Sequence, residues 1–299
     1  MAFDFVSPCS HEPLSWVDSS YVSASGETYP IVNGIPQLVD ATMLAGVEEF
    51  SSTYAAVRIA EGRSSASSEY YRALPHDDLT GQFRDQWSRR ALTFGALVGQ
   101  IEGDGLDIVD VGAGNCWLSA RLAELGHSLL ALDLNDDGHD GLAASRHYPE
   151  SFQVARAHGL AIPLREASAD MVVFNAAAHY FPLREAISEA RRILRFGGRI
   201  VIADSPVYKQ ESAGVAMVES MSDYIVSLGV EPAAHAGKGF LTDRDLADCG
   251  VRWRRTELDG TGLRSIRRKV AGYRAGRELA TLPLLVAPIG HHADTRQDL

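Results

Sequence analysis

Short apolar runs alternate with helical segments over most of the chain after residue 105. The strand-like runs are residues 106–111, 128–132, 171–174 and 199–203, and residues 251–258 and 282–289 can supply closing strands. The helical segments between them include 117–125, which stops at a glycine, and the amphipathic stretch 183–194. This alternation predicts an α/β fold with a mostly parallel sheet that is covered by helices on both faces.

The sequence before this region has a different pattern. Residues 1–45 read as short strands and turns, which predicts a small β-rich N-terminal cap. Residues 46–100 read as helices joined by a Ser-rich link, which predicts a helical lid or linker region. Residues 101–299 are then expected to form the main domain.

Composition excludes several classes of protein. Hydrophobic residues make up 45% of the 299 positions and charged residues 22%, which is ordinary for a soluble globular chain. Three cysteines fit a reducing compartment, and no run approaches the ~18–20 apolar residues of a membrane span. The first residues lack the pattern of a signal peptide, so we expect a cytoplasmic protein without membrane contact.

The charge is unevenly distributed. A formal net charge of −11 argues against a nucleic-acid partner, because such proteins usually carry a net basic face. Residues 252–277 differ from the rest, since nine basic and two acidic residues give them a charge of 9 − 2 = +7. That stretch could meet a phosphate-bearing partner, or it could balance acidic neighbours on the surface.

A glycine loop follows the first strand-like run of the α/β region. It reads Asp110-Val-Gly-Ala-Gly-Asn-Cys-Trp117 and leads into a helix. Gly112 and Gly114 permit a tight turn and the close approach of a ligand. The dinucleotide fingerprint needs a third glycine where Trp117 stands, which argues against a nicotinamide cofactor. Asp110 would repel a pyrophosphate but attract an ammonium or sulfonium group.

An acidic residue also ends the second strand-like run. A carboxylate at Asp133 can accept two hydrogen bonds from a ribose diol. The alternative is a turn or helix cap, because Asn135-Asp-Asp-Gly138 follows. The glycine loop in the preceding unit favours ribose binding.

Further motifs follow this pair in order, and the series resembles that of class I S-adenosylmethionine-dependent methyltransferases. The resemblance covers about residues 80–290, and its motifs are Asp110-Val-Gly-Ala-Gly114, Ala131-Leu-Asp-Leu-Asn135, Ala161-Ile-Pro-Leu164, Ala169-Asp-Met-Val-Val-Phe-Asn175 and Arg191-Arg-Ile-Leu-Arg-Phe-Gly-Gly-Arg-Ile-Val-Ile202. It implies a Rossmann-like, seven-stranded sheet, S-adenosylmethionine as cofactor and S-adenosylhomocysteine as product, with no metal.

The resemblance also implies which residues hold the cofactor. They are Asp110, Gly112, Ala113, Gly114, Asn115, Asp133, Leu134, His158, Gly159, Asn175 and Ala176. Asp110 would lie near the amino group of the methionine part, Asp133 at the ribose and Leu134 against the adenine. Two positions depart from the family pattern: Cys116 replaces a third glycine, and His158 replaces an acid near the adenine amino group.

Residues 27–38 resemble the end of a Trm112-like or zinc-ribbon module, which usually binds zinc through two Cys pairs. Here only Cys9 and His11 stand near the first pair, and residues 12–45 contain neither Cys nor His. Four tetrahedral ligands cannot be assembled locally, so we expect no structural zinc. The segment would then serve as a cap, or contribute to a substrate or homodimer surface.

Candidate residues for the chemistry lie near the strand ends. Methyl transfer needs mainly alignment, and a base only if the nucleophile loses a proton. His179 is the candidate base, although it could instead support the next helix. Tyr208 is expected to face the pocket and Tyr180 to form its wall. Tyr54 and Arg58 lie one helical turn apart, where they could cover a ligand or bind an acidic group, or simply pack.

These observations favour S-adenosylmethionine-dependent methyl transfer to a small molecule, which could be acidic or phosphate-bearing. The acceptor atom could be O, N or C. One alternative is an RNA or protein methyltransferase. The other is a methyltransferase-like fold that transfers no methyl group and instead binds a ligand, supports a partner or catalyses a different reaction.

Overall fold

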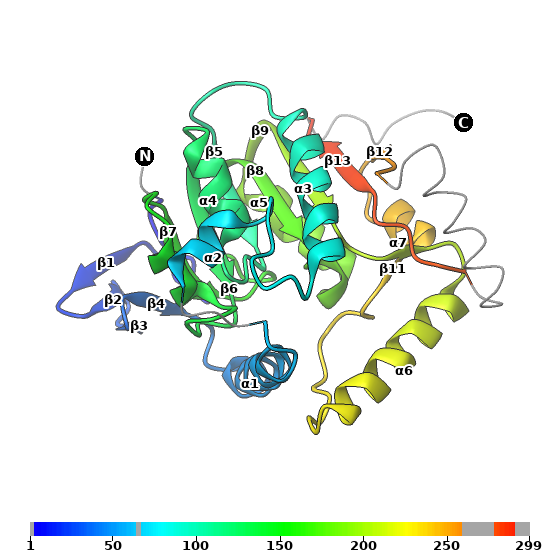
Figure 1. The fold of residues 1–299 in the computed structure, drawn as a ribbon. Helices are drawn as coiled ribbons and strands as arrows, with labels where there is room; N and C mark the ends of the chain where they lie inside the picture. Colours follow the sequence, from blue (N-terminus) through cyan, green and yellow to red (C-terminus); the bar gives the residue numbers. More distant parts are fainter. Residues whose placement is uncertain (1–2, 64–66, 259–277, 291–299) are drawn as a thin grey trace.

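The central sheet has the predicted α/β arrangement. The computed structural model describes residues 3–63, 67–258 and 278–290. Seven strands lie in the order β7-β6-β5-β8-β9-β13-β12 (Figure 1). Their bounds are β5 Asp107–Val111, β6 Ser128–Asp133, β7 Gln153–Ala157, β8 Ala169–Asn175, β9 Leu194–Ala203, β12 Arg254–Thr256 and β13 Leu284–Pro288. The first five are parallel, while β13 is antiparallel to both β9 and β12. The predicted seven-stranded, Rossmann-like fold is confirmed.

The N-terminal strands lengthen this sheet. β1 Leu14–Val17, β2 Ser20–Ser23, β3 Thr28–Val32 and β4 Ile35–Leu38 form an antiparallel meander. β4 then pairs in parallel with β7, with Leu38 opposite Ala157, so the sheet has eleven strands. Phe5, Tyr29 and Leu38 are buried in the same core as the central strands. The expected cap is therefore built into the sheet.

Alternate side chains of the buried strands point to opposite faces of the sheet. On β8, Val172 and Phe174 pack toward α5 Leu183–Ile193, while Met171 and Val173 pack into the core on the other face. That second core is formed with α2 Ser68–Ala73, α3 Arg84–Val98 and α4 Trp117–Glu124. Continuous apolar strands of this kind are expected where both faces of a parallel sheet are covered.

Two further helices flank the strand ends. α1 Leu44–Ala60 runs past the carboxyl edge of the parallel strands, and α6 Glu211–Ser227 stands away from the sheet (Figure 1). The short strands β10 Val207–Tyr208 and β11 Leu241–Thr242 pair with each other on either side of α6 in the sequence. The sequence patterns indicated neither α2, β7 nor α6.

A capping box is present at the start of α7 Asp243–Asp248. Thr242 Oγ1 accepts a hydrogen bond from the Asp245 amide at 3.1 Å, and Asp245 Oδ2 accepts one from the Thr242 amide at 2.9 Å. Most of the basic stretch 252–277 lies outside the described residues. Within its described part, Arg255 pairs with Asp243 and Glu257, each at 2.6 Å.

No helix in the described part of the chain is long and apolar enough to cross a membrane. Over the same residues, no group of three or more His, Cys, Asp or Glu side chains could hold a metal ion.

Candidate functional site

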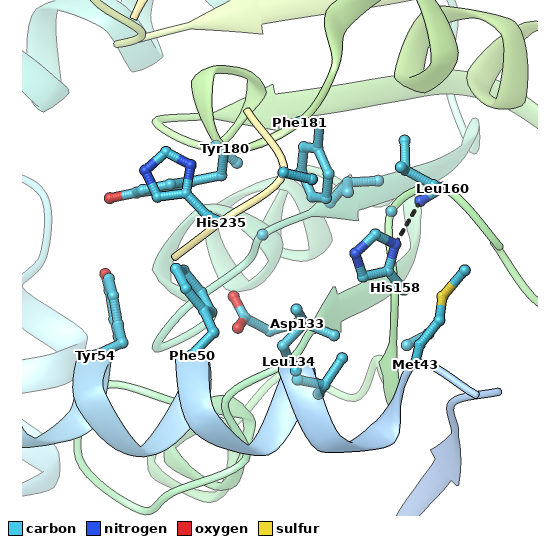
Figure 2. Close-up of a pocket in the computed structure, with 18 of the residues that line it drawn as sticks. Met43, Phe50, Tyr54, Asp133, Leu134, His158, Leu160, Tyr180, Phe181 and His235 are labelled. Atoms are coloured by element: carbon cyan, nitrogen blue, oxygen red, sulfur yellow. Dashed lines mark hydrogen bonds between the residues drawn. The ribbon is translucent and has the colours of Figure 1, made fainter. Parts of the chain in front are cut away.

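A cavity of about 510 Å³ lies at the carboxyl edge of the parallel strands (Figure 2). Its floor comes from the loops after β5, β6, β7 and β8, and its roof from α1 and residues 234–236. This edge is where ligands bind in open α/β sheets. The volume falls within the range of small-molecule and cofactor sites.

The glycine loop after β5 forms part of the floor. Gly112 has φ +75°, and a Cβ there would lie 2.4 Å from the Cβ of Ala177. Both facts require glycine at this position. The Gly112 amide donates to the Leu132 carbonyl at 2.8 Å, which fixes the loop against the end of β6.

Asp133 lies in the middle of the cavity wall. Its Oδ2 accepts a hydrogen bond from the Gly114 amide at 2.7 Å, and its Oδ1 accepts one from the Asn135 amide at 2.8 Å. Burial raises the pKa of this carboxyl to about 6, although the hydrogen bonds from the two amides act to lower it. Each carboxylate oxygen retains acceptor capacity beyond its amide bond, so Asp133 can take two hydroxyl donors from the cavity.

One end of the cavity is mostly apolar. Met43, Leu134, Leu160 and Phe181 line it together with His158. The Nδ1 atom of His158 accepts a hydrogen bond from the Leu160 amide at 3.2 Å, and burial lowers the pKa of the ring, so His158 is neutral near pH 7. This end suits a flat, uncharged ring system.

The other end is built from four rings. Phe50 and Tyr54 come from α1, Tyr180 from the turn η2 Ala178–Tyr180, and His235 from the segment before β11 (Figure 2). Ring centroids lie 5.6 Å apart for Phe50 and Tyr180, and 5.2 Å apart for Tyr180 and His235. We call this end the aromatic compartment.

Backbone hydrogen bonds hold the segment that carries His235. The Gly237 amide donates to the Tyr180 carbonyl at 2.8 Å, and the Gly239 amide donates to the His179 carbonyl at 3.0 Å. A Cβ at Gly237 would lie 2.4 Å from the His179 carbonyl oxygen, so only glycine permits this contact. The segment is thereby fixed over the end of β8.

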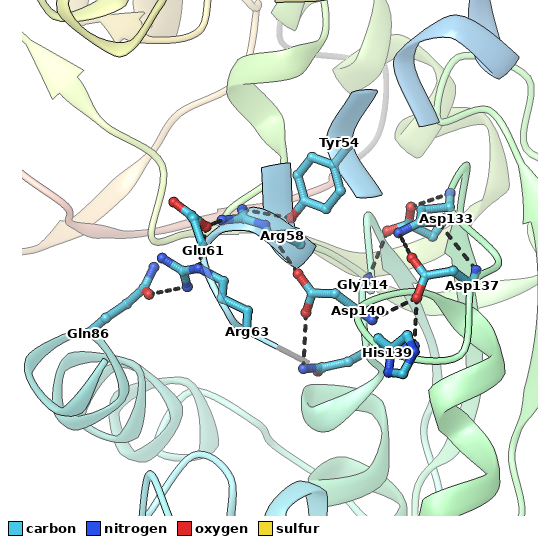
Figure 3. A network of polar contacts seen from close by, with 12 residues as sticks. Tyr54, Arg58, Glu61, Arg63, Gln86, Gly114, Asp133, Asp137, His139 and Asp140 are labelled. Atoms are coloured by element: carbon cyan, nitrogen blue, oxygen red, sulfur yellow. Dashed lines mark hydrogen bonds and ion pairs between the residues drawn. The ribbon is translucent and has the colours of Figure 1, made fainter. Parts of the chain in front are cut away.

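A polar network ties α1 to the loop after β6 (Figure 3). Arg58 Nε lies 3.1 Å from Asp140 Oδ2, its Nη1 donates to Glu61 at 2.8 Å, and its Nη2 donates to the Tyr54 hydroxyl at 2.8 Å. Asn115 Nδ2 donates to the same Asp140 carboxylate at 3.3 Å. The roof helix is therefore linked to the loops that form the floor.

Nine residues expected at the site line the cavity: Tyr54, Gly112, Gly114, Asp133, Leu134, His158, Gly159, Ala176 and Tyr180. Seven others do not: Arg58, Asp110, Ala113, Asn115, Asn175, His179 and Tyr208. Arg58 and Asn115 both bond Asp140 instead, as part of the polar network.

Asp110 is fully buried beneath the glycine loop. It sits on β5 at the face covered by α4, where its Oδ2 accepts a hydrogen bond from Ser119 at 2.8 Å. Its Oδ1 is buried without a hydrogen-bond partner. Burial raises the pKa of this carboxyl to about 7. Asp110 still belongs to β5, where its side chain faces α4, whereas Gly112 follows the end of the strand and lies at the cavity.

The two expected catalytic residues lie beside the cavity. His179 Nδ1 is 3.2 Å from Ser205 Oγ, and burial lowers the pKa of its ring to about 3, which makes it a weak base. Tyr208 is buried in β10 with its ring edge-on to Phe240, at 5.9 Å between centroids. The strand pair β10·β11 points Tyr208 into packing instead of toward the ligand.

Several lining residues carried no sequence signal that we used. Met43, Val47 and Phe50 recur at helical spacing with the predicted Tyr54 and therefore lie on one face of α1 and its N-cap, which the sequence could have shown. His235 could not be found this way, because its place depends on backbone contacts with residues far away in sequence.

Residues 109–202 match the family model described as a methyltransferase domain. This part of the chain is therefore similar to methyltransferase domains. The match runs from β5 to β9, so the matched residues include the glycine loop, Asp133 and His158, whereas α1 and His235 lie outside them. No protein of curated function matches the sequence.

Several solved structures are similar to part of this chain at low identity. Geranyl diphosphate C-methyltransferase from Streptomyces coelicolor is 17% identical with a TM-score of 0.48, and the match covers 69% of this chain and 82% of that one. Phosphoethanolamine N-methyltransferase 2 of Haemonchus contortus is 14% identical with a TM-score of 0.46, and the match covers 68% of this chain and 52% of that one. A chain from the Haloferax volcanii complex that contains the Trm112 methyltransferase activator is 17% identical with a TM-score of 0.49. The match covers 70% of this chain and 94% of that one. Such distant likenesses do not indicate an acceptor.

Proposed function

We propose that the protein transfers a methyl group from S-adenosylmethionine to a small-molecule acceptor. The observation that carries the proposal is Asp133: a carboxylate at the end of β6, held by the Gly114 and Asn135 amides, that faces an enclosed cavity within a methyltransferase domain.

The residues at the cavity fit S-adenosylmethionine. Asp133 would accept the two ribose hydroxyls, and the apolar end with Leu134, His158 and Phe181 would hold the adenine. Gly112 and Gly114 would pass beneath the methionine part. Asp110, when ionised, would favour a positive charge above the glycine loop from its buried position.

Bound in this way, S-adenosylmethionine supplies an activated methyl group on a positively charged sulfur. The chain then needs to align an acceptor with that methyl group and to keep water out. The rings of the aromatic compartment can do both, because they wall the cavity where the loops after β5 and β8 meet.

A small acceptor is supported by the shape of the cavity. α1 and residues 234–236 cover it, and α1 is tied down by Arg58 and Asp140. A macromolecular acceptor would have to insert a single group through this cover. Among the described lining residues there is no Lys or Arg, so an acidic or phosphate-bearing acceptor would find no basic partner in the cavity wall.

Titration calorimetry with S-adenosylmethionine and S-adenosylhomocysteine tests the proposal. We expect micromolar binding by the wild type. Asp133→Ala should weaken it at least tenfold, because hydrogen bonds to a charged group contribute about 1.5–3 kcal/mol each. Absence of binding up to millimolar ligand would contradict the proposal and favour a methyltransferase-like fold without methyl transfer.

A further inference from the structure

The imidazole of His158 has a fixed arrangement of hydrogen-bond donor and acceptor. A backbone amide can only donate, and the Leu160 amide donates to His158 Nδ1 at 3.2 Å. That nitrogen therefore carries a lone pair and no proton. Because burial lowers the pKa of the ring, His158 is neutral near pH 7 and holds one ring proton. This proton lies on Nε2, which makes Nε2 a donor.

Nε2 points into the cavity. It lies on the side of the ring opposite Nδ1, and Figure 2 shows it directed away from Leu160 into the space that the lining residues enclose. It makes no hydrogen bond within the described part of the chain, yet the protein does not enclose it, so a ligand can reach it. A donor placed in this way calls for an acceptor on the ligand.

The chain sets the direction of this donor before any ligand binds. Turning the ring over would place a carbon against the Leu160 amide and leave that amide without its acceptor. The ring also stands edge-on to Phe181, at 5.6 Å between centroids. A Cβ at Gly159 would lie 2.8 Å from Phe181 and from Val111, so the backbone beside His158 is held close to both side chains.

His158 is the polar side chain that can recognise a ring held at the apolar end of the cavity. Its neighbours there are apolar, and the hydroxyl of Thr42, which also lines the cavity, donates to Asp40 at 2.7 Å. Adenine carries ring nitrogens, which accept hydrogen bonds, and an amino group, which donates them. An Nε2 donor that faced the amino group would stay unpaired, at a cost to binding.

We propose that His158 donates from Nε2 to a ring nitrogen of adenine, and that it accepts no hydrogen bond from the adenine amino group. This inference rests on the proposed function. The resemblance implies an acid at this position, and a carboxylate can only accept. The adenine end of this chain would thus have the opposite hydrogen-bond polarity, so binding should depend on a ring nitrogen and tolerate loss of the amino group.

Titration calorimetry at pH 8, where Asp133 is ionised, tests this polarity. The ligands are S-adenosylhomocysteine, its 1-deaza, 3-deaza and 7-deaza analogues, in which CH replaces one ring nitrogen, and a 6-deamino analogue, in which hydrogen replaces the amino group. The matched variants are His158→Asn and His158→Asp. Both side chains can accept the Leu160 amide, but only Asn also offers a donor. Affinity ratios are compared within each protein, and thermal unfolding reports on folding.

We expect at least one deaza analogue to bind the wild type about fivefold or more weakly than the parent ligand, because the Nε2 donor is left unpaired. The 6-deamino analogue should bind within about twofold of the parent. His158→Asn should keep this order. In His158→Asp the loss with that deaza analogue should disappear, and the 6-deamino analogue should bind about fivefold more weakly than the parent.

The position of the ring proton can be checked without a ligand. Nitrogen-15 NMR of protein with labelled histidine distinguishes protonated from unprotonated ring nitrogens, and the signals that are missing in His158→Asn identify this residue. We expect Nε2 to be protonated and Nδ1 unprotonated.

The outcomes separate this inference from the proposed function. If the folded wild type binds no S-adenosylhomocysteine, the proposed function is wrong, and the inference falls with it. If it binds the parent but only the 6-deamino analogue is weakened, His158 accepts from the amino group. A deaza loss that persists unchanged in His158→Asp, or a proton on Nδ1, would likewise overturn the role of His158 as donor.

Discussion

Asp110 and Asp133 end adjacent strands, yet their surroundings give them different tasks. Asp110 is enclosed between the sheet and α4 with a single hydrogen bond, from Ser119. Asp133 accepts hydrogen bonds from two backbone amides and faces the cavity. Burial raises the pKa of both carboxyls, to about 7 and about 6. Only Asp133 can offer its oxygens to a ligand.

Cofactor affinity should therefore depend on pH through Asp133. Ribose hydroxyls donate to the ionised carboxylate, so affinity for S-adenosylmethionine should be full above about pH 7 and fall as the pH drops through about 6. His158 and His235 also line the cavity, but burial lowers their pKa values, and Tyr54 and Tyr180 stay protonated because burial raises theirs.

Calorimetry at pH 8, 6 and 5 checks this dependence. Asp133→Asn keeps the shape of the side chain but cannot ionise, so its weaker affinity should no longer fall near pH 6 and should keep only the dependence that comes from Asp110, whose pKa is about 7. A wild-type affinity that does not change between pH 8 and pH 5 would contradict the assignment of Asp133 to the ribose.

Gly237 is a second position where one residue decides the site. A Cβ there would lie within 2.5 Å of backbone atoms of Tyr180 and Phe181, so Gly237→Ala must displace the segment that carries His235. We expect a loss of about 1–3 kcal/mol in the free energy of unfolding, together with a large fall in kcat. Gly95 in α3 has open space around it, so Gly95→Ala should be neutral or slightly stabilising in the same urea titrations.

At the scale of elements, α1 depends on its ties to the floor of the cavity. No side chain caps either end of α1, and the residues of α1 that line the cavity lie on one face of the helix. The pairing of Arg58 with Asp140 joins it to the loop after β6, which also carries Asp133. The position of α1 and the shape of the cavity beneath it are thus coupled.

Removing this tie should weaken cofactor binding. In Arg58→Met, Asp140 loses its nearest positive charge and α1 is free to move away, so we expect S-adenosylmethionine to bind about tenfold more weakly. A double-mutant cycle with Asp140→Asn should give a coupling of about 0.5–3 kcal/mol. Arg165→Met removes an exposed pair with Asp4 and should leave binding unchanged. Additive effects at Arg58 and Asp140 would contradict the coupling.

The sequence predicted the elements whose cause is local and missed those that depend on distant contacts. Strands β5, β6, β8 and β9 were found because both their faces are buried, which makes them continuous apolar runs. Gly112 and Asp133 were found because their spacing along the chain places them at adjacent strand ends. Arg58 was expected to cover a ligand, but its partner Asp140 lies far away in sequence. His235 was missed for the same reason.

At the scale of the whole molecule, the N-terminal strands and the parallel strands of the α/β region share one sheet and one core. Leu38 of β4 is fully buried and lies opposite Ala157 of β7, and Phe5 forms a bridge with Leu164 in the loop after β7. β7 would become an edge strand without β4, and an unprotected edge beside apolar surface favours aggregation. The N-terminal segment therefore supports the strand whose carboxyl end carries His158.

Unfolding should accordingly be a single transition in which both regions take part. Leu38→Ala removes a fully buried side chain from the shared core and should lower the free energy of unfolding by about 2–5 kcal/mol. Trp16→Ala, at a position that is 63% exposed on β1, should change it far less. Urea titrations followed by far-UV circular dichroism and by tryptophan fluorescence should give coincident curves for each protein, because cooperative unfolding looks the same to every probe. If Leu38→Ala instead produced an early transition while S-adenosylmethionine still bound, the N-terminal strands would be an independent unit, and their continuity with the sheet would contribute nothing to the cofactor site.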